Sequence, residues 1–124
     1  MPIERFEDIE AWKAARSLVQ SLYDTVRGSG LERDFGLRDQ IQRAAVSIMA
    51  NIAEGFDARS DQEFTRFLGY SFRSASELQS HLYVAEDQGY MDRATFNGLY
   101  DQATIIKKLL NGFIRYLKGE GGST

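Results

Sequence analysis

The sequence predicts an all-α protein, folded as an antiparallel, up-and-down four-helix bundle. Three observations support this fold class. Apolar residues recur at steps of three and four along four long stretches, which is the spacing of one face of a helix. The only proline is Pro2, so no later residue removes a backbone donor from a helix. Short turns separate the stretches, and none shows the polar and apolar alternation that is typical of a strand.

The first helix is expected over residues 7–27. Its apolar positions recur at the helical spacing: Ile9, Trp12, Ala15, Val19, Leu22, Tyr23 and Val26. This is the stripe of an amphipathic helix that covers a core with one face. Residues 28–36, which read GSGLERDFG, end the helix and form the longest connection in the chain.

The central helix is expected over residues 37–56. More than half of its circumference is apolar, so neighbouring helices should enclose it on several sides. Its apolar face comprises Leu37, Ile41, Ala44, Ala45, Ile48 and Ile52, extended by Val46, Met49 and Ala53. A narrow polar strip on the same helix comprises Arg43, Ser47, Asn51 and Glu54. Gly55 is expected to end the helix as a C-terminal cap.

Two further helices follow, each with a regular heptad seam. Ser60 and Glu63 predict a capping box at the start of the third helix, which should continue up to Gly89. Its seam comprises Phe64, Leu68, Ser71, Ala75, Leu78, Leu82 and Ala85. The seam of the fourth helix comprises Phe96, Leu99, Ala103, Ile106, Leu110, Phe113 and Leu117. Seams of this regularity suit long antiparallel helices packed at about 20°. We expect one domain over residues 1–118 and a disordered tail over residues 119–124.

Composition excludes several classes of protein. The chain has no cysteine, so it forms neither a disulfide framework nor a thiolate metal site, and a reducing cytoplasm is its expected setting. No run approaches the roughly 20 apolar residues of a membrane span, and the N-terminus lacks the pattern of a signal peptide. His81 is the only histidine and no Glu-x-x-His motif occurs, so we expect no metal and no other cofactor.

Polar residues on the second and third helices form the first candidate site, which comprises Arg43, Ser47, Asn51, Glu54, Ser74 and Glu77. The favoured interpretation is structural: Arg43 pairs with Glu77 or Glu54, and the remaining groups complete a buried hydrogen-bond network. Such a network would set helix register or form a subunit interface. The alternative is an enzyme that uses Arg43, Asn51 and Glu54 around a small pocket, although no activated nucleophile with a base beside it is evident.

A basic ridge on the fourth helix forms the second candidate site, a surface for nucleic acid or another partner. It comprises Arg93, Lys107, Lys108, Arg115 and Lys118. No acidic residue occurs between Gln102 and Lys118, so the ridge could neutralise phosphates. Cations near a helix C-terminus also suit the helix dipole and keep a face soluble, and the net charge of −3 favours this second reading for a single chain. Repetition of the ridge in an oligomer would make the surface multivalent.

The chain resembles the four-helix proteins encoded in bacterial 23S ribosomal RNA intervening sequences. The segment RAAVSIMANIAEG, residues 43–55, matches the core motif of that family, and the likeness extends over nearly the whole chain except the tail. Trp12, Ser74 and Glu77 also lie where the family pattern expects them. Met49 stands where the family commonly has a proline, which predicts an uninterrupted central helix.

The resemblance implies a homopentameric ring in the bacterial cytosol, with no established enzymatic activity. A related group assists the reverse transcriptase of diversity-generating retroelements and associates with nucleic acid. The chain is therefore expected to be a non-enzymatic, homo-oligomeric scaffold or accessory protein whose partner is RNA or a nucleic-acid-bound protein, with no membrane partner. The alternative is a protein-interaction module of the mobile-element or toxin–antitoxin type that binds no nucleic acid.

Overall fold

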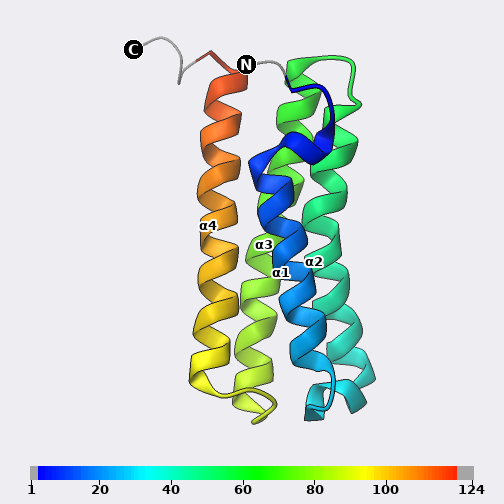
Figure 1. The fold of residues 1–124 in the computed structure, drawn as a ribbon, viewed down its shortest axis with the longest axis vertical. Coiled ribbons are helices and arrows are strands. Elements are labelled where there is room, and N and C mark those ends of the chain that lie inside the picture. The colour runs from blue at the N-terminus through cyan, green and yellow to red at the C-terminus, as the bar shows by residue number, and fades with distance from the viewer. Residues whose placement is uncertain (1–2, 120–124) are drawn as a thin grey trace.

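The computed structural model describes residues 3–119, which form four long helices in up-and-down order (Figure 1). The helices are α1 (Glu10–Val26), α2 (Phe35–Phe56), α3 (Asp61–Asp87) and α4 (Arg93–Leu117). Two 3-10 turns, η1 (Phe6–Asp8) and η2 (Gly30–Arg33), precede α1 and α2. No strand occurs within this range, so the predicted all-α, four-helix class is confirmed. Of the predicted disordered tail, residues 120–124 lie outside the described residues.

Polar side chains define where three of the helices begin. The carboxylate of Asp34 accepts a hydrogen bond from the Leu37 N–H at 3.2 Å, and the Ser60 hydroxyl accepts one from the Glu63 N–H at 3.1 Å. Asp92 does the same for α4 and accepts from the Thr95 N–H at 2.8 Å, which lowers the pKa of its carboxyl group. These contacts satisfy backbone donors that the first turn of a helix leaves unpaired.

Two of the expected helix starts were wrong. The first helix begins at Glu10 rather than at residue 7, because Ile9 has an extended backbone with ψ of 124° and separates η1 from α1. The Ile9 side chain is buried in the core, which explains why the chain bends there. The central helix begins at Phe35, two residues earlier than expected, because Asp34 caps it. It then continues without interruption past Met49, as expected.

The core follows the predicted seams closely. Every residue of the α3 seam is buried, and so is the α4 seam from Phe96 to Leu110. Leu18 and Leu22 of α1, together with Ile48 of α2, complete the centre with no solvent exposure. Phe113 and Leu117, at the far end of α4, are only half-buried. Ile3 and Leu117 line one hollow at this end, so the start of the described chain and the end of α4 lie together (Figure 1).

Gly55 does not cap the central helix, and that prediction was wrong. It lies inside α2, which continues to Phe56, and it is not among the glycines with positive φ. Instead, α2 and α3 approach closely at this point. A Cβ atom added to Gly55 would lie 2.7 Å from the Phe64 ring and 2.9 Å from Cβ of Phe67. Gly55 is therefore required for helix packing, and its lack of a side chain is the property that matters.

A hydrogen bond joins the two connections at the other end of the bundle. The Tyr90 hydroxyl, just after α3, donates to Oδ2 of Asp34 at 3.0 Å, while Oδ1 of Asp34 caps α2. The Tyr90 ring packs over Gly30, where an added Cβ would lie 2.6 Å from the ring. The hydrogen bond, burial and the negative charge of Asp34 each raise the pKa of Tyr90.

We expect the protein to lose stability at high pH through Tyr90. A pKa that is raised on folding gives stability that is present below about pH 10 and is lost as pH rises through the folded value. The tyrosinate would then lie against the Asp34 carboxylate. Urea unfolding midpoints at about pH 8 and about pH 11 measure the loss. Tyr90→Phe should reduce the pH dependence, whereas the control Tyr70→Phe should not, because no carboxylate accepts from Tyr70 among the described residues. Equal effects of both variants would contradict this assignment.

Candidate functional site

Three members of the predicted polar site form a hydrogen-bond network between α2 and α3. The hydroxyl groups of Ser47 and Ser74 lie 2.9 Å apart and join the two helices. The Asn51 amide donates to the Ser47 carbonyl at 2.9 Å and to the Ser47 hydroxyl at 3.0 Å. All three side chains are half-buried. These bonds tie the middle of α2 to the middle of α3.

The charged members of the polar site do not pair as expected. Glu77 contacts His81, with Oε2 of Glu77 3.2 Å from Nε2 of His81 along α3, rather than Arg43. Arg43 and Glu54 are exposed on the outer surface of α2, and neither side chain has an ion-pair or hydrogen-bond partner within residues 3–119. The predicted pairing of Arg43 was wrong because Arg43 lies on the exposed surface of α2, too far around the helix to reach Glu77. Water solvates an exposed charge, so no partner is required.

A second polar contact between α2 and α3 is fully buried. The Ser71 hydroxyl donates to the backbone carbonyl of Ile48 at 2.8 Å. The heptad pattern placed Ser71 in the seam correctly but gave no indication of this bond. A small hydroxyl side chain at this position allows the backbone of α2 to approach, and the bond satisfies its polar atom.

The basic ridge divides into engaged and free cations. Arg93 forms an ion pair with Glu86 at 2.7 Å. Lys107 is half-buried, donates to the side chain of Gln79 at 3.1 Å and lies 4.8 Å from the centre of the Phe72 ring. The three other cations are exposed, and their side chains have no ion-pair partner among the described residues: Lys108, Arg115 and Lys118. These three are the ridge residues that remain available for an anionic partner.

Gln79 is a buried polar residue that the sequence analysis missed. Only 6% of it is exposed, yet both polar atoms of its side chain have hydrogen-bond partners on α4. Its amide donates to the Thr104 hydroxyl at 2.9 Å and to the Tyr100 carbonyl at 3.2 Å, while its oxygen accepts from Lys107. It lies one residue beyond the seam residue Leu78 and is not part of the heptad seam. The network fixes α4 against α3 and holds Lys107 in place.

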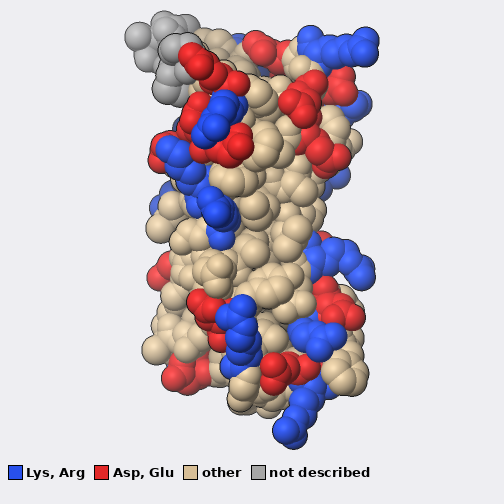
Figure 2. All heavy atoms as spheres, turned by 45° about the vertical axis from the view of Figure 1, so that its right-hand side comes forward, with Lys and Arg blue, Asp and Glu red and all other residues tan. Residues whose placement is uncertain are grey.

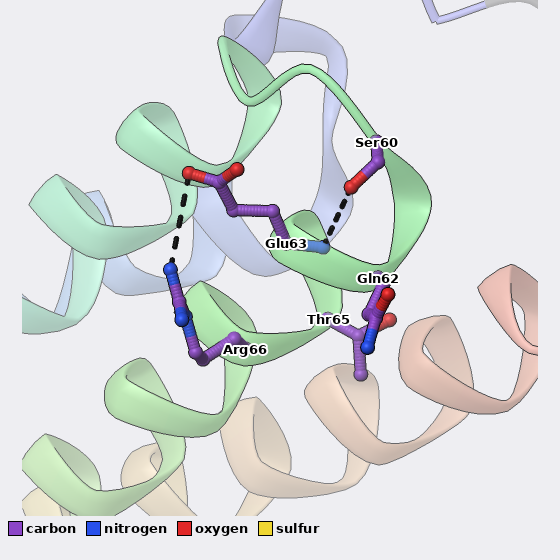
Figure 3. Close-up of a pocket in the computed structure, with 5 residues that line it drawn as sticks. All are labelled: Ser60, Gln62, Glu63, Thr65 and Arg66. Atoms are coloured by element: carbon purple, nitrogen blue, oxygen red, sulfur yellow. Dashed lines mark hydrogen bonds and ion pairs between the residues drawn. The ribbon is translucent and has the colours of Figure 1, made fainter.

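A polar hollow lies at the first turn of α3. Figure 3 shows its lining residues, Ser60, Gln62, Glu63, Thr65 and Arg66. The Ser60 hydroxyl is the helix cap, and Arg66 pairs with Glu63 at 3.9 Å. Within residues 3–119, no group of three or more histidine or acidic side chains could hold a metal ion. The helices of this range include none that is long and apolar enough to cross a membrane.

The outer surface of α2 has few charges at its middle. Figure 2 shows the α2 side of the bundle, on which most charged side chains gather towards the two ends and other residues form a band across the centre. The sequence of α2 explains this band, since no charged residue occurs between Arg43 and Glu54. Val46 lies between these two charges and is 39% exposed.

Comparisons with known proteins agree with this architecture. The model of the family described as 23S rRNA-intervening sequence protein matches residues 7–112. One similar solved structure is a protein of unknown function from the S23 ribosomal protein family of Bacteroides thetaiotaomicron VPI-5482. The two chains share 24% identity and superpose with a TM-score of 0.78 over 85% of this chain and 95% of the other, which supports the fold alone. No curated protein matches the chain significantly.

Proposed function

The chain belongs to the family of 23S rRNA-intervening sequence proteins, and from this premise we propose that it is a non-enzymatic, homo-oligomeric helical scaffold that binds RNA or a ribonucleoprotein partner. The observation that supports RNA binding is the set of exposed cations on the second half of α4, Lys108, Arg115 and Lys118. These side chains have no acidic partner within residues 3–119, so contact with phosphate would break no existing ion pair.

Self-association is the second part of the proposal, and a ring of five copies in the cytosol is what the family resemblance implies. One chain offers three free cations in a molecule of net charge −3, which gives weak attraction for a polyanion. A ring would repeat the same cations around its circumference. Several weak contacts made at once by one assembly raise the apparent affinity without any new contact in the single chain.

The RNA site is tested by reversing two of its charges. We expect Lys108→Glu with Lys118→Glu to weaken binding to structured RNA and to lower the slope of log Kd against log salt by about 2, since each cation that contacts a phosphate contributes about 1. Titrations at roughly 50 and 200 mM salt span the range over which such contacts lose affinity. Light scattering of the same samples reports the size of the particle.

The matched control reverses Lys13 on α1 and Arg27, which directly follows α1. Lys13→Glu with Arg27→Glu changes the net charge by the same amount, but each of these cations already pairs with an acidic residue of α1. This variant should retain most of the RNA affinity. If both double variants lose affinity equally, the effect comes from net charge and the ridge is not the site. If the unmodified protein binds no RNA at the lower salt, RNA is not the partner.

A protein-interaction module is the second candidate function. The observation that favours it is the excess of acidic residues, 18 Asp and Glu against 15 Lys and Arg, which suits a basic protein better than a polyanion. Purification that recovers one protein in a fixed ratio, unaffected by nuclease, would support this candidate over RNA binding.

A further inference from the structure

We propose that the outer faces of α2 and α4 are the two halves of one contact, by which copies of this chain join side by side into a closed ring. The inference rests on the proposed self-association and deepens it by naming the surfaces that meet. It assigns Arg115 to the contact between copies, which leaves Lys108 and Lys118 for RNA. Because two different surfaces meet, the contact is heterologous: each copy offers its α2 face to one neighbour and its α4 face to the other.

The α2 face consists of Arg43, Val46, Ala50 and Glu54. All four are exposed, and they recur at three and four residues, so they lie on one side of the helix. The two charges at its ends have no partner within the described chain. Between them the surface is small and uncharged, which allows another helix to approach.

The α4 face consists of Asp101, Ile105, Leu109, Gly112 and Arg115. Ile105 is 55% exposed and Leu109 is 37% exposed, although the core of the bundle lies on the opposite side of this helix. Asp101 and Arg115 are exposed at its two ends and have no ion-pair partner within residues 3–119. The face therefore has an apolar middle and one charge at each end, as the α2 face has, and Lys108 lies midway along the edge that Asp101 and Arg115 share.

The two faces point away from each other in the bundle. Both α2 and α4 pack against α1 and against α3, so α2 and α4 occupy diagonal corners and their outer faces lie on opposite sides. Both helices also run in the same direction, from the end that holds Tyr90 towards the end that holds Leu117 (Figure 1). Copies arranged side by side in the same orientation would bring α4 of one copy against α2 of the next as parallel helices.

Contacts to α3 show which residues of α2 and α4 lie at the same height. Ser74 of α3 contacts Ser47 of α2. On either side of Ser74, Phe72 lies against Lys107 and Gln79 bonds to Thr104. Ser47 is therefore level with the turn of α4 that holds Thr104 and Lys107.

Counting helical turns from this level aligns opposite charges. Arg43 is one turn before Ser47 and comes within about two residues of the level of Asp101, while Glu54 is two turns after Ser47 and comes within about three residues of the level of Arg115, a gap that these side chains can span. Val46 and Ala50 then lie opposite Ile105 and Leu109.

The matching charges also lie on the same rim of the contact. Arg43 and Glu54 lie on the side of α2 nearer α3, and Asp101 and Arg115 lie on the side of α4 nearer α3, as their helical positions require. In a ring every copy turns its α3 to the same side, so each charge meets its opposite. Both pairs stay within side-chain reach when neighbouring copies lie at the same height, and an assembly without a rise closes into a ring instead of extending as a filament.

Two glycines within α4 agree with close approach by a neighbouring copy. Gly98 and Gly112 lie inside the helix, where glycine costs roughly 0.5–1 kcal/mol relative to alanine. A Cβ added to Gly98 would contact nothing within 4 Å, and one added to Gly112 would meet only the tip of Arg115 at 4.0 Å. Packing inside the single chain does not explain these glycines, whereas a helix seated on the α4 face would use the space.

A charge exchange tests the contact. Arg43→Asp and Asp101→Arg, made singly, each place like charges opposite one another, so either variant should raise the dissociation constant of self-association by at least about tenfold. The mass measured by light scattering should then fall towards the 14.1 kDa of one chain. The double variant Arg43→Asp with Asp101→Arg restores opposite charges and should restore the mass of the unmodified oligomer. Asp87→Arg, at the exposed end of α3, is the matched control and should leave the mass unchanged.

Three outcomes would overturn the proposal. The first is an unmodified protein that is a single chain at all concentrations. The second is a pair of single variants that keep the full mass. The third is rescue of Arg43→Asp by Glu54→Arg in place of Asp101→Arg, which would show that α2 packs antiparallel against α2 of a second copy. Far-UV circular dichroism confirms that each variant is folded. Lys108 lies at the edge of the α4 face, so light scattering of Lys108→Glu with Lys118→Glu separates the two proposals: RNA affinity that falls while the mass is unchanged reports on the RNA site alone.

Discussion

Gly55→Ala is expected to lower the free energy of unfolding by about 1–3 kcal/mol, the usual cost of forcing an extra carbon into a packed core. The added Cβ would meet the Phe64 ring at 2.7 Å and, at 2.9 Å, the Cβ atom of Phe67. The ring can rotate slightly, but Cβ of Phe67 moves only if the backbone of α3 moves. Separation of α2 from α3 would also lengthen the bond from Ser71 to the Ile48 carbonyl, which is now 2.8 Å. Urea denaturation followed by circular dichroism measures the change.

The control for this prediction is Gly69→Ala, within α3. A Cβ at Gly69 would contact nothing within 4 Å, so alanine should be neutral or should stabilise the helix by up to about 1 kcal/mol. The two substitutions add the same methyl group to glycines inside helices, and only the local space differs. A similar effect at both positions would mean that Gly55 is retained for a reason other than helix packing.

Gln79→Ala is expected to cost about 2–3 kcal/mol of stability. The substitution removes three hydrogen bonds between α3 and α4, one of them from the Lys107 ammonium group, and bonds to charged groups contribute more than neutral ones. The Thr104 hydroxyl and Lys107 would lose a partner inside the groove between the helices. Gln62→Ala, at an exposed position on the same helix, should change stability by less than about 0.5 kcal/mol.

Lys107 provides a second readout for the Gln79 variant. Without Gln79, its ammonium group should leave the Phe72 ring, above which it now lies at 4.8 Å, and extend into water. Mobility of the lysine side chain, measured by NMR relaxation, should increase in Gln79→Ala and remain unchanged in Gln62→Ala. A rigid Lys107 in both proteins would show that the aromatic contact alone holds it.

The helices and the core could be predicted from the sequence because their determinants are local and periodic. A heptad seam is a property of residues three and four apart, and the α3 seam from Phe64 to Ala85 is buried in full. The start of α3 could also be predicted from the sequence, because Ser60 caps the backbone N–H of a residue only three positions away. The break at Ile9 could not be predicted, because it depends on the burial of the Ile9 side chain in a core formed by distant residues.

The candidate site was predictable only in part, because residue spacing gives the face of a residue but not its partner. The positions of Ser47, Asn51 and Ser74 on facing sides of two helices indicated a network, and the network exists. Arg43 shares the same strip, yet it lies far enough around α2 to miss Glu77. The role of Gly55 depended on two phenylalanines on another helix, and no pattern within α2 contains that information.

The shared location of Ile3 and Leu117 has a consequence for any fusion to this protein. Ile3 and Leu117 line the same hollow, so an extra domain attached before one or after the other would emerge at the same end of the bundle. The proposed ring places every bundle in the same orientation, and all such attachments would therefore gather on one rim. A domain fused before Ile3 or after Leu117 would therefore occur in many copies on one side of the ring. The opposite rim and the α2 and α4 faces would remain free of it.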